Sequence, residues 1–364
     1  MNTPNGATRR ELLDRRLSGF HDVTVADVLE VLDYLRGPGD TVVAGGSLAF
    51  GLGNRLSDFD VVICGGATSP SLVPLQHWVK SLRVDVWTRS HADLDRLFRL
   101  AQEALERPTP IAGAFGSVEH EQQLKLLHRI AFGLDVAGPP IAPVSVPDFR
   151  KVARDLVVRE YAERLRESVW VAQLAGRTGR WLAATVNARE AVEEALTIVL
   201  TTGAVPFTGD KWLHERLKSE APQLRERYRR FAQLPTAAAE CSGYVRDAVA
   251  LATRLTGIPV DLDALGTQAS WVGSGLHVSR TGTTQLLVAP AGGGVWELSE
   301  TDLTAWAARS QPPPAGTEPV RAVWPGNGSV EADFCLGLYE RGLVSLVWDC
   351  GVPVSDLTVE VVHA

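Results

Sequence analysis

The order of apolar and polar residues over the first ninety positions predicts a small unit of mixed helix and strand. Apolar residues recur at helical spacing between Val23 and Arg36, and Gly37-Pro38-Gly39 predicts the end of that helix. Strands are expected at 41–44, 58–64 and 83–87, with a helical stretch at 72–82 between the last two. Strands that alternate with helices are typical of an α/β fold.

A different pattern follows from His91 to about Leu255, where apolar residues recur every three or four positions over long stretches. Helices are expected at 93–107, 118–132, 147–175, 181–202 and 211–234, and together they predict a helical domain. Beyond Ile258, short strands between Trp271 and Thr301, a helix at 330–341 and a strand at 343–348 predict a small α+β unit. We therefore expect three domains, at residues 1–92, 93–262 and 266–364.

Composition and charge narrow the protein class. The chain has 364 residues and a formal net charge of −7. No apolar run reaches the roughly 18 residues of a membrane span, and the arginine-rich first sixteen residues lack the apolar stretch of a secretory signal. We expect a cytoplasmic protein. Without a clustered basic face, a long nucleic acid is not an expected partner.

The four cysteines do not form a recognisable site. Cys64, Cys241, Cys335 and Cys350 are scattered, and no C-x-x-C pair occurs. This spacing argues against both a disulfide framework and a zinc site, so reduced thiols are expected.

Candidate chemistry begins at the end of the first expected strand. The turn Gly45-Gly46-Ser47 is followed, after ten residues, by Asp58-Phe59-Asp60. Residues i and i+2 of a strand share one face, so Asp58 and Asp60 are expected side by side. Adjacent carboxylates of this kind hold hard cations such as Mg²⁺ together with phosphate oxygens of a substrate.

Asp85 is a candidate third carboxylate. Its apolar neighbours Val84 and Val86 suggest a strand beside the first pair. Three acids could hold two Mg²⁺ ions, which would activate a hydroxyl and neutralise a leaving pyrophosphate during displacement at phosphorus. The glycines of Gly45-Gly46-Ser47 would allow the backbone and the Ser47 hydroxyl to approach the triphosphate of an NTP. Isolated acids and glycine turns are usually structural, but their order and spacing favour a nucleotide site.

These residues resemble the signature of the DNA polymerase beta-like nucleotidyltransferase superfamily over about the first ninety positions. The resemblance implies that Ser47 binds nucleotide phosphates and that Asp58 and Asp60 ligate both metal ions. It also implies that Asp85 is the third ligand or activates the acceptor hydroxyl. The expected fold class is an α/β nucleotidyltransferase core, then an α-helical domain and a small α+β winged-helix-like domain.

The helical domain is similar to that of the aminoglycoside and lincosamide nucleotidyltransferases, which implies a small-molecule acceptor bound between the two parts. Lys211 follows a turn at a helix start, where it could contact a phosphate or simply be solvated. Arg189 is a further candidate cofactor-binding residue, although Glu190 and Glu193 offer it ordinary ion pairs. The helix expected at 118–132 carries His120, Glu121, His128 and Arg129, which could face the catalytic cleft. A histidine there could act as a base for the acceptor hydroxyl, although histidines on amphipathic helices are usually surface or packing residues.

The last ninety residues resemble the peptide-chaperone family of pyrroloquinoline quinone biosynthesis. Such winged-helix-like domains bind leader peptides as an added strand, so a leader peptide is a possible partner. The proline-rich stretch 311–319 departs from that pattern. A purely structural or oligomerising module is the equal alternative, because Trp296 and Trp306 would serve any small core.

The function expected from these features is Mg²⁺-dependent transfer of a nucleoside monophosphate, AMP by default, from an NTP to a hydroxyl of a small molecule or peptide. A setting in natural-product biosynthesis or modification follows from the two resemblances. Two alternatives stay open. One is a non-catalytic leader-peptide recognition protein, and the other is a nucleotidyltransferase that AMPylates proteins.

Overall fold

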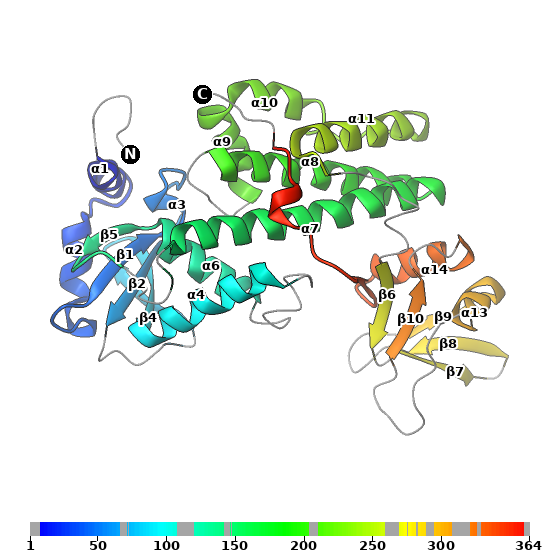
Figure 1. Ribbon diagram of the computed structural model, residues 1–364, viewed down its shortest axis with the longest axis horizontal. Helices are drawn as coiled ribbons and strands as arrows, with labels where there is room; N and C mark the ends of the chain where they lie inside the picture. Colours follow the sequence, from blue (N-terminus) through cyan, green and yellow to red (C-terminus); the bar gives the residue numbers. More distant parts are fainter. Residues whose placement is uncertain are drawn as a thin grey trace.

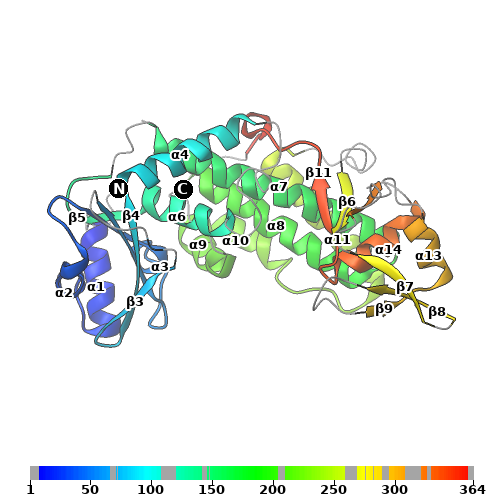
Figure 2. The ribbon, with the colours of Figure 1, turned by 90° about the horizontal axis from the view of Figure 1, so that it is seen from below.

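The fold places a small sheet at one end of a long helix and a second β-containing module at the other (Figures 1 and 2). The computed structural model describes residues 8–65, 71, 73–107, 120–141, 146, 148–203, 210–258, 269–274, 276–281, 283–288, 295–307, 321–325 and 329–359. None of the helices in those ranges is long and apolar enough to cross a membrane.

Within the described residues, five strands form one mixed sheet in the order β3-β4-β2-β1-β5. The strands are β1 (Thr41–Gly45), β2 (Phe59–Gly65), β3 (Leu75–Val79), β4 (Leu82–Ser90) and β5 (Leu134–Ala137). The pair β2/β4 is parallel, whereas the other neighbouring pairs are antiparallel. The α/β character expected from the sequence is therefore present.

Both faces of the sheet are covered, because side chains alternate along each central strand. Val61 and Ile63 of β2 pack towards helices α1 (Arg9–His21) and α2 (Val25–Val31). Val62 and Cys64 pack towards α4 (His91–Glu106) and α6 (His120–Phe132). Asp60 has the same parity as Val62, so its carboxylate lies on the face covered by α4 and α6.

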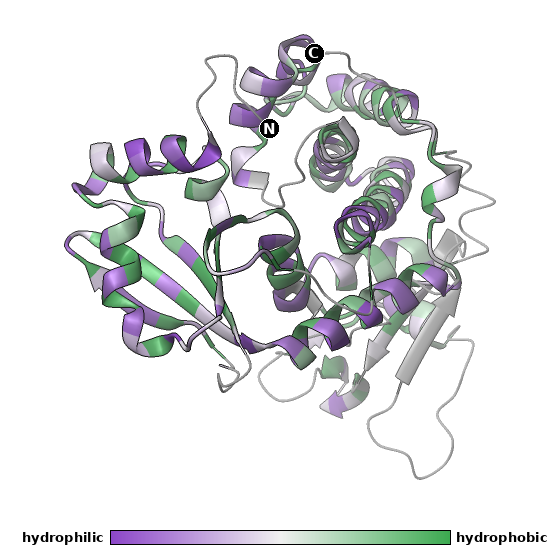
Figure 3. Cartoon of the chain, turned by 60° about the vertical axis from the view of Figure 1, so that its left-hand side comes forward, coloured by the Kyte–Doolittle hydropathy of each residue, from purple (hydrophilic) through white to green (hydrophobic). Residues whose placement is uncertain are grey.

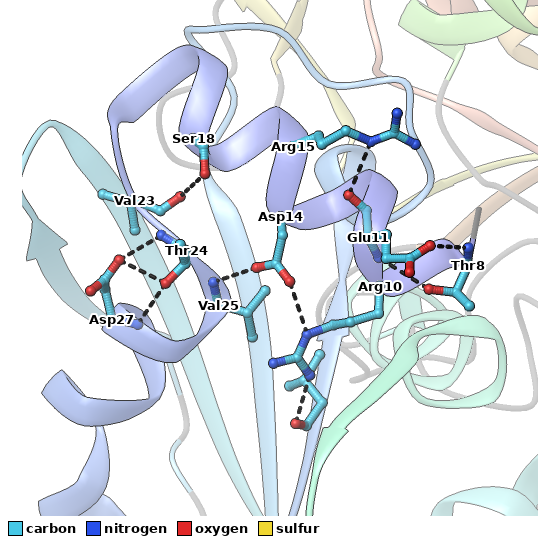
Figure 4. A network of polar contacts seen from close by, with 11 residues as sticks. Thr8, Arg10, Glu11, Asp14, Arg15, Ser18, Val23, Thr24, Val25 and Asp27 are labelled. Atoms are coloured by element: carbon cyan, nitrogen blue, oxygen red, sulfur yellow. Dashed lines mark hydrogen bonds and ion pairs between the residues drawn. The ribbon is translucent and has the colours of Figure 1, made fainter.

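The helices α1 and α2 begin at well-formed caps (Figure 4). Thr8 and Glu11 form one capping box, and Thr24 and Asp27 form the other. Arg10 then donates to the carbonyl of Val136 on β5, 2.8 Å away. The first helix is thereby attached to the edge of the sheet.

The central part is helical. Its long elements are α7 (Phe149–Arg177), α8 (Trp181–Gly203) and α11 (Ala238–Thr256), with η2 (Asp210–Trp212), α9 (Leu213–Glu220) and α10 (Pro222–Arg229) between the last two. Figure 3 shows hydrophobic and hydrophilic residues alternating around these helices, and the apolar stripes form one buried cluster.

The C-terminal module contains two three-stranded antiparallel sheets among its described residues, β10-β6-β11 and β7-β8-β9. The strands are β6 (Ala269–Ser274), β7 (His277–Thr281), β8 (Thr284–Val288), β9 (Val295–Glu297), β10 (Arg321–Pro325) and β11 (Ser345–Trp348), with helices α13 (Glu300–Ala307) and α14 (Ser329–Tyr339). The winged-helix resemblance and the leader peptide stay predictions. The proline-rich stretch 311–319 lies outside the described residues.

Several sequence expectations were wrong in detail. The stretch 72–82 contains strand β3 in place of a helix, and β3 pairs with β4 through a turn at Lys80, whose φ is +52°. The helix expected at 211–234 is split before Pro222, which starts α10 because its ring nitrogen has no hydrogen to donate. Leu134–Ala137, within the region expected to be helical, joins the sheet as β5.

Candidate functional site

Three residues from the sequence motif lie in one row across the sheet. Asp60 pairs in register with Gly45 of β1 on one side and with Asp85 of β4 on the other. Asp58 precedes β2 by one residue and has the same parity as Asp60. Asp60 and Asp85 are buried, with 7% and 8% of their surface exposed. The sheet therefore brings the three carboxylates together on one face, at the start of β2 and on the neighbouring strand β4.

We call Asp58, Asp60 and Asp85 the carboxylate row. The turn after β1 is packed directly against it. Gly46 has a φ of +70°, and a Cβ built on it would lie 2.0 Å from Oδ2 of Asp60. Only glycine fits this position, because any side chain would overlap the carboxylate and strain the backbone. The following residue, Ser47, belongs to the short helix α3 (Gly46–Ala49), and its carbonyl accepts the amides of Leu52 and Gly53 from the loop after that helix, each at 2.9 Å.

Two arginines bind the carboxylates. Arg83, two residues before Asp85 on β4, pairs with both Asp58 and Asp85. Arg129 of α6 pairs with Asp60 at 2.8 Å. The carboxylate row is therefore contacted by one guanidinium from the sheet and one from the covering helix.

Burial and mutual repulsion change the acidity of this row. Burial, opposed by Arg129 and reinforced by Asp58 and Asp85, raises the pKa of Asp60 to about 6. Burial also raises the pKa of Asp85, while the nearby Arg83 lowers it. Ionised carboxylates that lie this close repel one another, so a further cation between them would stabilise their charged forms.

The row opens into a cavity of about 550 Å³ between the sheet and the helices. The sheet contributes acids, and the helices contribute Lys125 and Arg129 from α6, Glu160 and Arg164 from α7, and Lys211 from η2. Lys211 is exposed, and its ammonium lies 5.5 Å from the centre of the Trp212 ring. The cavity thus has carboxylates on the sheet and mostly basic groups on the surrounding helices.

The carboxylate oxygens of the row are the type of ligand that a divalent cation prefers. The row supplies oxygen ligands only. Oδ1 of Asp85 is buried and has no hydrogen bond among the described residues, but it lies 3.3 Å from Nε of Arg83. In the described chain, no three His, Cys, Asp or Glu side chains are gathered into a ready metal-binding group. Arg83 lies between Asp58 and Asp85, and its side chain is 42% exposed. If the Arg83 side chain turned towards solvent, a cation could occupy the position of its guanidinium between Asp58 and Asp85.

The other predicted site residues fall into two groups. Gly46, Ser47 and Lys211 line the cavity with the acids, and Gly45 adjoins it, since a Cβ there would contact Arg129 at 2.9 Å. Arg189 is not among the lining residues. It pairs with Glu193 at 3.6 Å on α8.

The candidate base helix is partly described. His128 and Arg129 line the cavity, but the His128 ring is buried beside Phe50 and Phe132. The side chains of His120 and Glu121 lie outside the described residues.

Sequence reasoning missed several lining residues. Trp87, Glu160, Tyr161 and Arg164 belong to the cavity, and Arg83 contacts the acids. Arg83 and Trp87 lie two positions before and after Asp85 on the same strand. They could have been predicted to share its face, because alternate residues of a strand do so. The spacing of Glu160 and Arg164 indicated only a helical ion pair, which the structure contains at 2.9 Å.

The sequence matches no family model and no curated relative. Among solved structures, the chain is similar to a nucleotidyltransferase-like protein from Exiguobacterium sibiricum, with a TM-score of 0.33 and 11% sequence identity. The similarity covers 66% of this chain and 73% of that one.

Proposed function

We propose that the chain is a nucleotidyltransferase that moves a nucleoside monophosphate from an Mg²⁺-bound NTP to a hydroxyl group. The observation that carries the proposal is the convergence of Asp58, Asp60 and Asp85 beside the Gly46 turn, at the mouth of a cavity with basic walls. Pairs of Mg²⁺ ions held by such acids stabilise both the attacking and the leaving oxygen of an in-line displacement at phosphorus.

The acids have separate tasks in this proposal. Asp58 and Asp60 hold the cations, because their carboxylates share one face at the start of β2. Asp85 ligates as well or accepts the proton of the acceptor hydroxyl. Burial raises the pKa of Asp85, and a raised pKa makes a carboxylate a better proton acceptor.

The turn and the helices bind the triphosphate. Gly46 lets the chain pass close to the acids, and the Ser47 hydroxyl and neighbouring amides bind phosphate oxygens. Lys125, Arg129 and Lys211 line the opposite wall, where their charges offset the negative charge of the phosphates. Arg189 has no part in this arrangement.

The proposal is tested by nucleotide binding and turnover. Purified protein is titrated with each labelled NTP in the presence of Mg²⁺, and pyrophosphate release is followed with acceptor mixtures. Wild-type protein should bind at least one NTP, and the double variant Asp58→Asn/Asp60→Asn should lose both binding and turnover. Equal behaviour of the two proteins, or no binding of any NTP to the wild type, would contradict the proposal. ATP is the first nucleotide to try.

A further inference from the structure

A second cavity, of about 490 Å³, lies on the far side of Trp87 from the carboxylate row. Trp87 lines both cavities, so the two are neighbours across one indole ring. The second cavity is lined by Trp87 and Arg89 of β4, by Asp93, Arg96 and Leu97 of α4, and by Leu126 of α6. None of these residues has a role in the proposed binding of the NTP.

Strand β4 connects the two cavities. Asp85, Trp87 and Arg89 alternate along β4 and therefore lie on the same face of the sheet. At about 3.3 Å per residue, the Cα atoms of Asp85 and Arg89 are roughly 13 Å apart. A molecule that reaches the Asp85 carboxylate along this face would pass over Trp87 and end beside Arg89.

The second cavity differs in charge from the carboxylate row. Arg89 lies with its guanidinium carbon 5.4 Å from the centre of the Trp87 ring, and Nη1 donates to the carbonyls of Ser71 and Thr88. Arg96 adds a second guanidinium, whereas Asp93 is the sole acid among the lining residues. The Asp93 carboxylate accepts the Ser90 hydroxyl at 2.6 Å as part of the α4 cap.

Two partly buried side chains would gain from a ligand here. Burial lowers the pKa of Arg89 and the neighbouring Asp93 raises it, so a second anion beside the guanidinium would favour its charged form. The indole Nε1 of Trp87 is buried and has no hydrogen-bond partner within the described ranges. A buried donor of this kind is normally satisfied by an acceptor atom.

We infer that the second cavity is the acceptor subsite, and that the acceptor carries an anionic group, such as a carboxylate, on a planar or apolar body that ends in the reacting hydroxyl. This inference rests on the proposed function, because it needs Asp85 beside the hydroxyl. The anionic group lies between Arg89 and Arg96, the body lies over Trp87 against Leu97 and Leu126, and the hydroxyl meets Asp85. An ammonium group in the same place would face two guanidiniums.

The bond changes follow from this placement. The hydroxyl oxygen forms a bond to the α-phosphorus of the NTP, and the bond from that phosphorus to the bridging oxygen of the β-phosphate breaks. Pyrophosphate leaves with that oxygen and the electron pair, and the hydroxyl proton passes to the Asp85 carboxylate. The product is a phosphodiester, in which the transferred phosphate joins the acceptor oxygen to the nucleoside.

Two probes that differ only in their charged end group test the inference. The probes are 3-(4-hydroxyphenyl)propionate and tyramine, which present the same phenol with a carboxylate or an ammonium at the other end. Each is titrated calorimetrically into the full-length protein saturated with Mg²⁺ and a non-hydrolysable NTP. We expect the carboxylate probe to bind at least about tenfold more tightly than tyramine, the effect of one charge-assisted hydrogen bond.

Variants then locate the binding group. Arg89→Gln and Arg96→Gln should each weaken the carboxylate probe about tenfold and leave tyramine little changed. Arg96 is 71% exposed, so its replacement does not disturb the core even if Arg89→Gln impairs folding. Arg99→Gln is the matched control, because Arg99 is an exposed arginine of the same helix and is not a lining residue. It should leave the affinity for the probe unchanged.

The outcomes separate the two proposals. Failure of the wild type to bind any Mg²⁺-NTP contradicts the proposed function itself. If the NTP binds but neither probe does, or the two probes bind equally, the acceptor inference is overturned. The same holds if the preference for the carboxylate survives both Arg89→Gln and Arg96→Gln.

Discussion

Asp60 has the most perturbed carboxyl group of the candidate site, and its acidity predicts a pH dependence of stability. Its pKa of about 6 exceeds the value of about 3.9 in an unfolded chain, so the folded chain binds the proton more tightly. The free energy of unfolding should therefore fall as pH rises from about 4 to about 6, by roughly 3 kcal/mol at most. Urea unfolding of wild type and Asp60→Asn across this range measures the effect, which should be absent in the variant.

The same group predicts how metal binding depends on pH. A carboxylate must lose its proton before it can ligate a cation. Mg²⁺-NTP affinity should accordingly weaken as pH falls through about 6, the pKa of Asp60. Calorimetric titration at several pH values checks this. An affinity that stays constant between pH 7 and pH 5 would show that Asp60 is not a ligand.

Gly46 offers a test of the close contact between the turn and the acids. Gly46→Ala should destabilise the chain and weaken Mg²⁺-NTP binding more than tenfold, because the new Cβ would overlap Oδ2 of Asp60. Gly179→Ala is the matched control. Gly179 also has a positive φ, +77°, but no atom lies within 4 Å of its Cβ position. It should cost about 1–2 kcal/mol of stability and leave nucleotide binding intact. Comparable loss of binding in both variants would contradict the account.

For individual residues, the sequence predicted the acids of the site but not the arginines that pair with them. Asp58, Asp60 and Gly46 could be singled out because strand parity and the glycine turn are local properties. Arg129 could not, because its contact with Asp60 depends on how α6 packs across the sheet. Arg189 is the converse case. Its helix and its ion pair with Glu193 could be read from the sequence, but its place outside the cavity lining could not, because that depends on how α8 packs.

Among the elements, helices α4 and α7 pack through apolar residues and are also joined by one buried arginine. Arg159 is 3% exposed, pairs with Glu163 at 3.0 Å and donates to the carbonyls of Ala104 and Leu105 at the end of α4. Arg159→Ala should destabilise the chain by roughly 3–5 kcal/mol, since it removes the guanidinium that pairs with a buried carboxylate and binds two carbonyls.

The control for this prediction is an exposed pair on the same helix. Lys151 pairs with Asp155, and its side chain is 72% exposed. Lys151→Ala should cost less than about 1 kcal/mol. Urea unfolding of the two variants gives the comparison, and similar losses in both would contradict the role assigned to Arg159.

The elements show why periodicity predicts long helices better than short strands. The positions of α7 and α8 were anticipated closely, since their apolar stripes run through many turns. Strand β3 was mistaken for a helix because it is an edge strand with exposed apolar residues, Leu75 and Trp78, and therefore lacks a clear alternation. The pairing of β5 with β1 joins residues about ninety positions apart, and no local pattern indicates it.

In the molecule as a whole, one buried apolar cluster extends from the central helices into the C-terminal module. Trp170 of α7 lies 5.3 Å from Trp271 of β6 and 6.1 Å from Trp348 of β11, measured between ring centres. Arg166 of α7 covers the Trp348 ring at 4.2 Å. Because the two parts share this cluster, we expect them to unfold together in urea.

Trp170→Ala tests the shared core. Removal of this ring, which is 2% exposed, should cost roughly 3–5 kcal/mol. The matched control, Trp78→Ala, removes a ring that is 66% exposed on the edge strand and should change stability by less than about 0.5 kcal/mol. Circular dichroism and hydrogen exchange should report one transition in the wild type. Separate transitions of the helices and the module would contradict a common core.

The central claim is that three acids and a glycine turn bind a metal-NTP complex at one end of the molecule. A crystal structure of the full chain with Mn²⁺ and a non-hydrolysable NTP tests it most directly, since Mn²⁺ is located by its anomalous scattering. We expect metal peaks between Asp58, Asp60 and Asp85, with Arg83 turned away from them and the triphosphate beside Gly46 and Ser47. Metal or nucleotide bound elsewhere, with the acids still paired to Arg83 and Arg129, would contradict it.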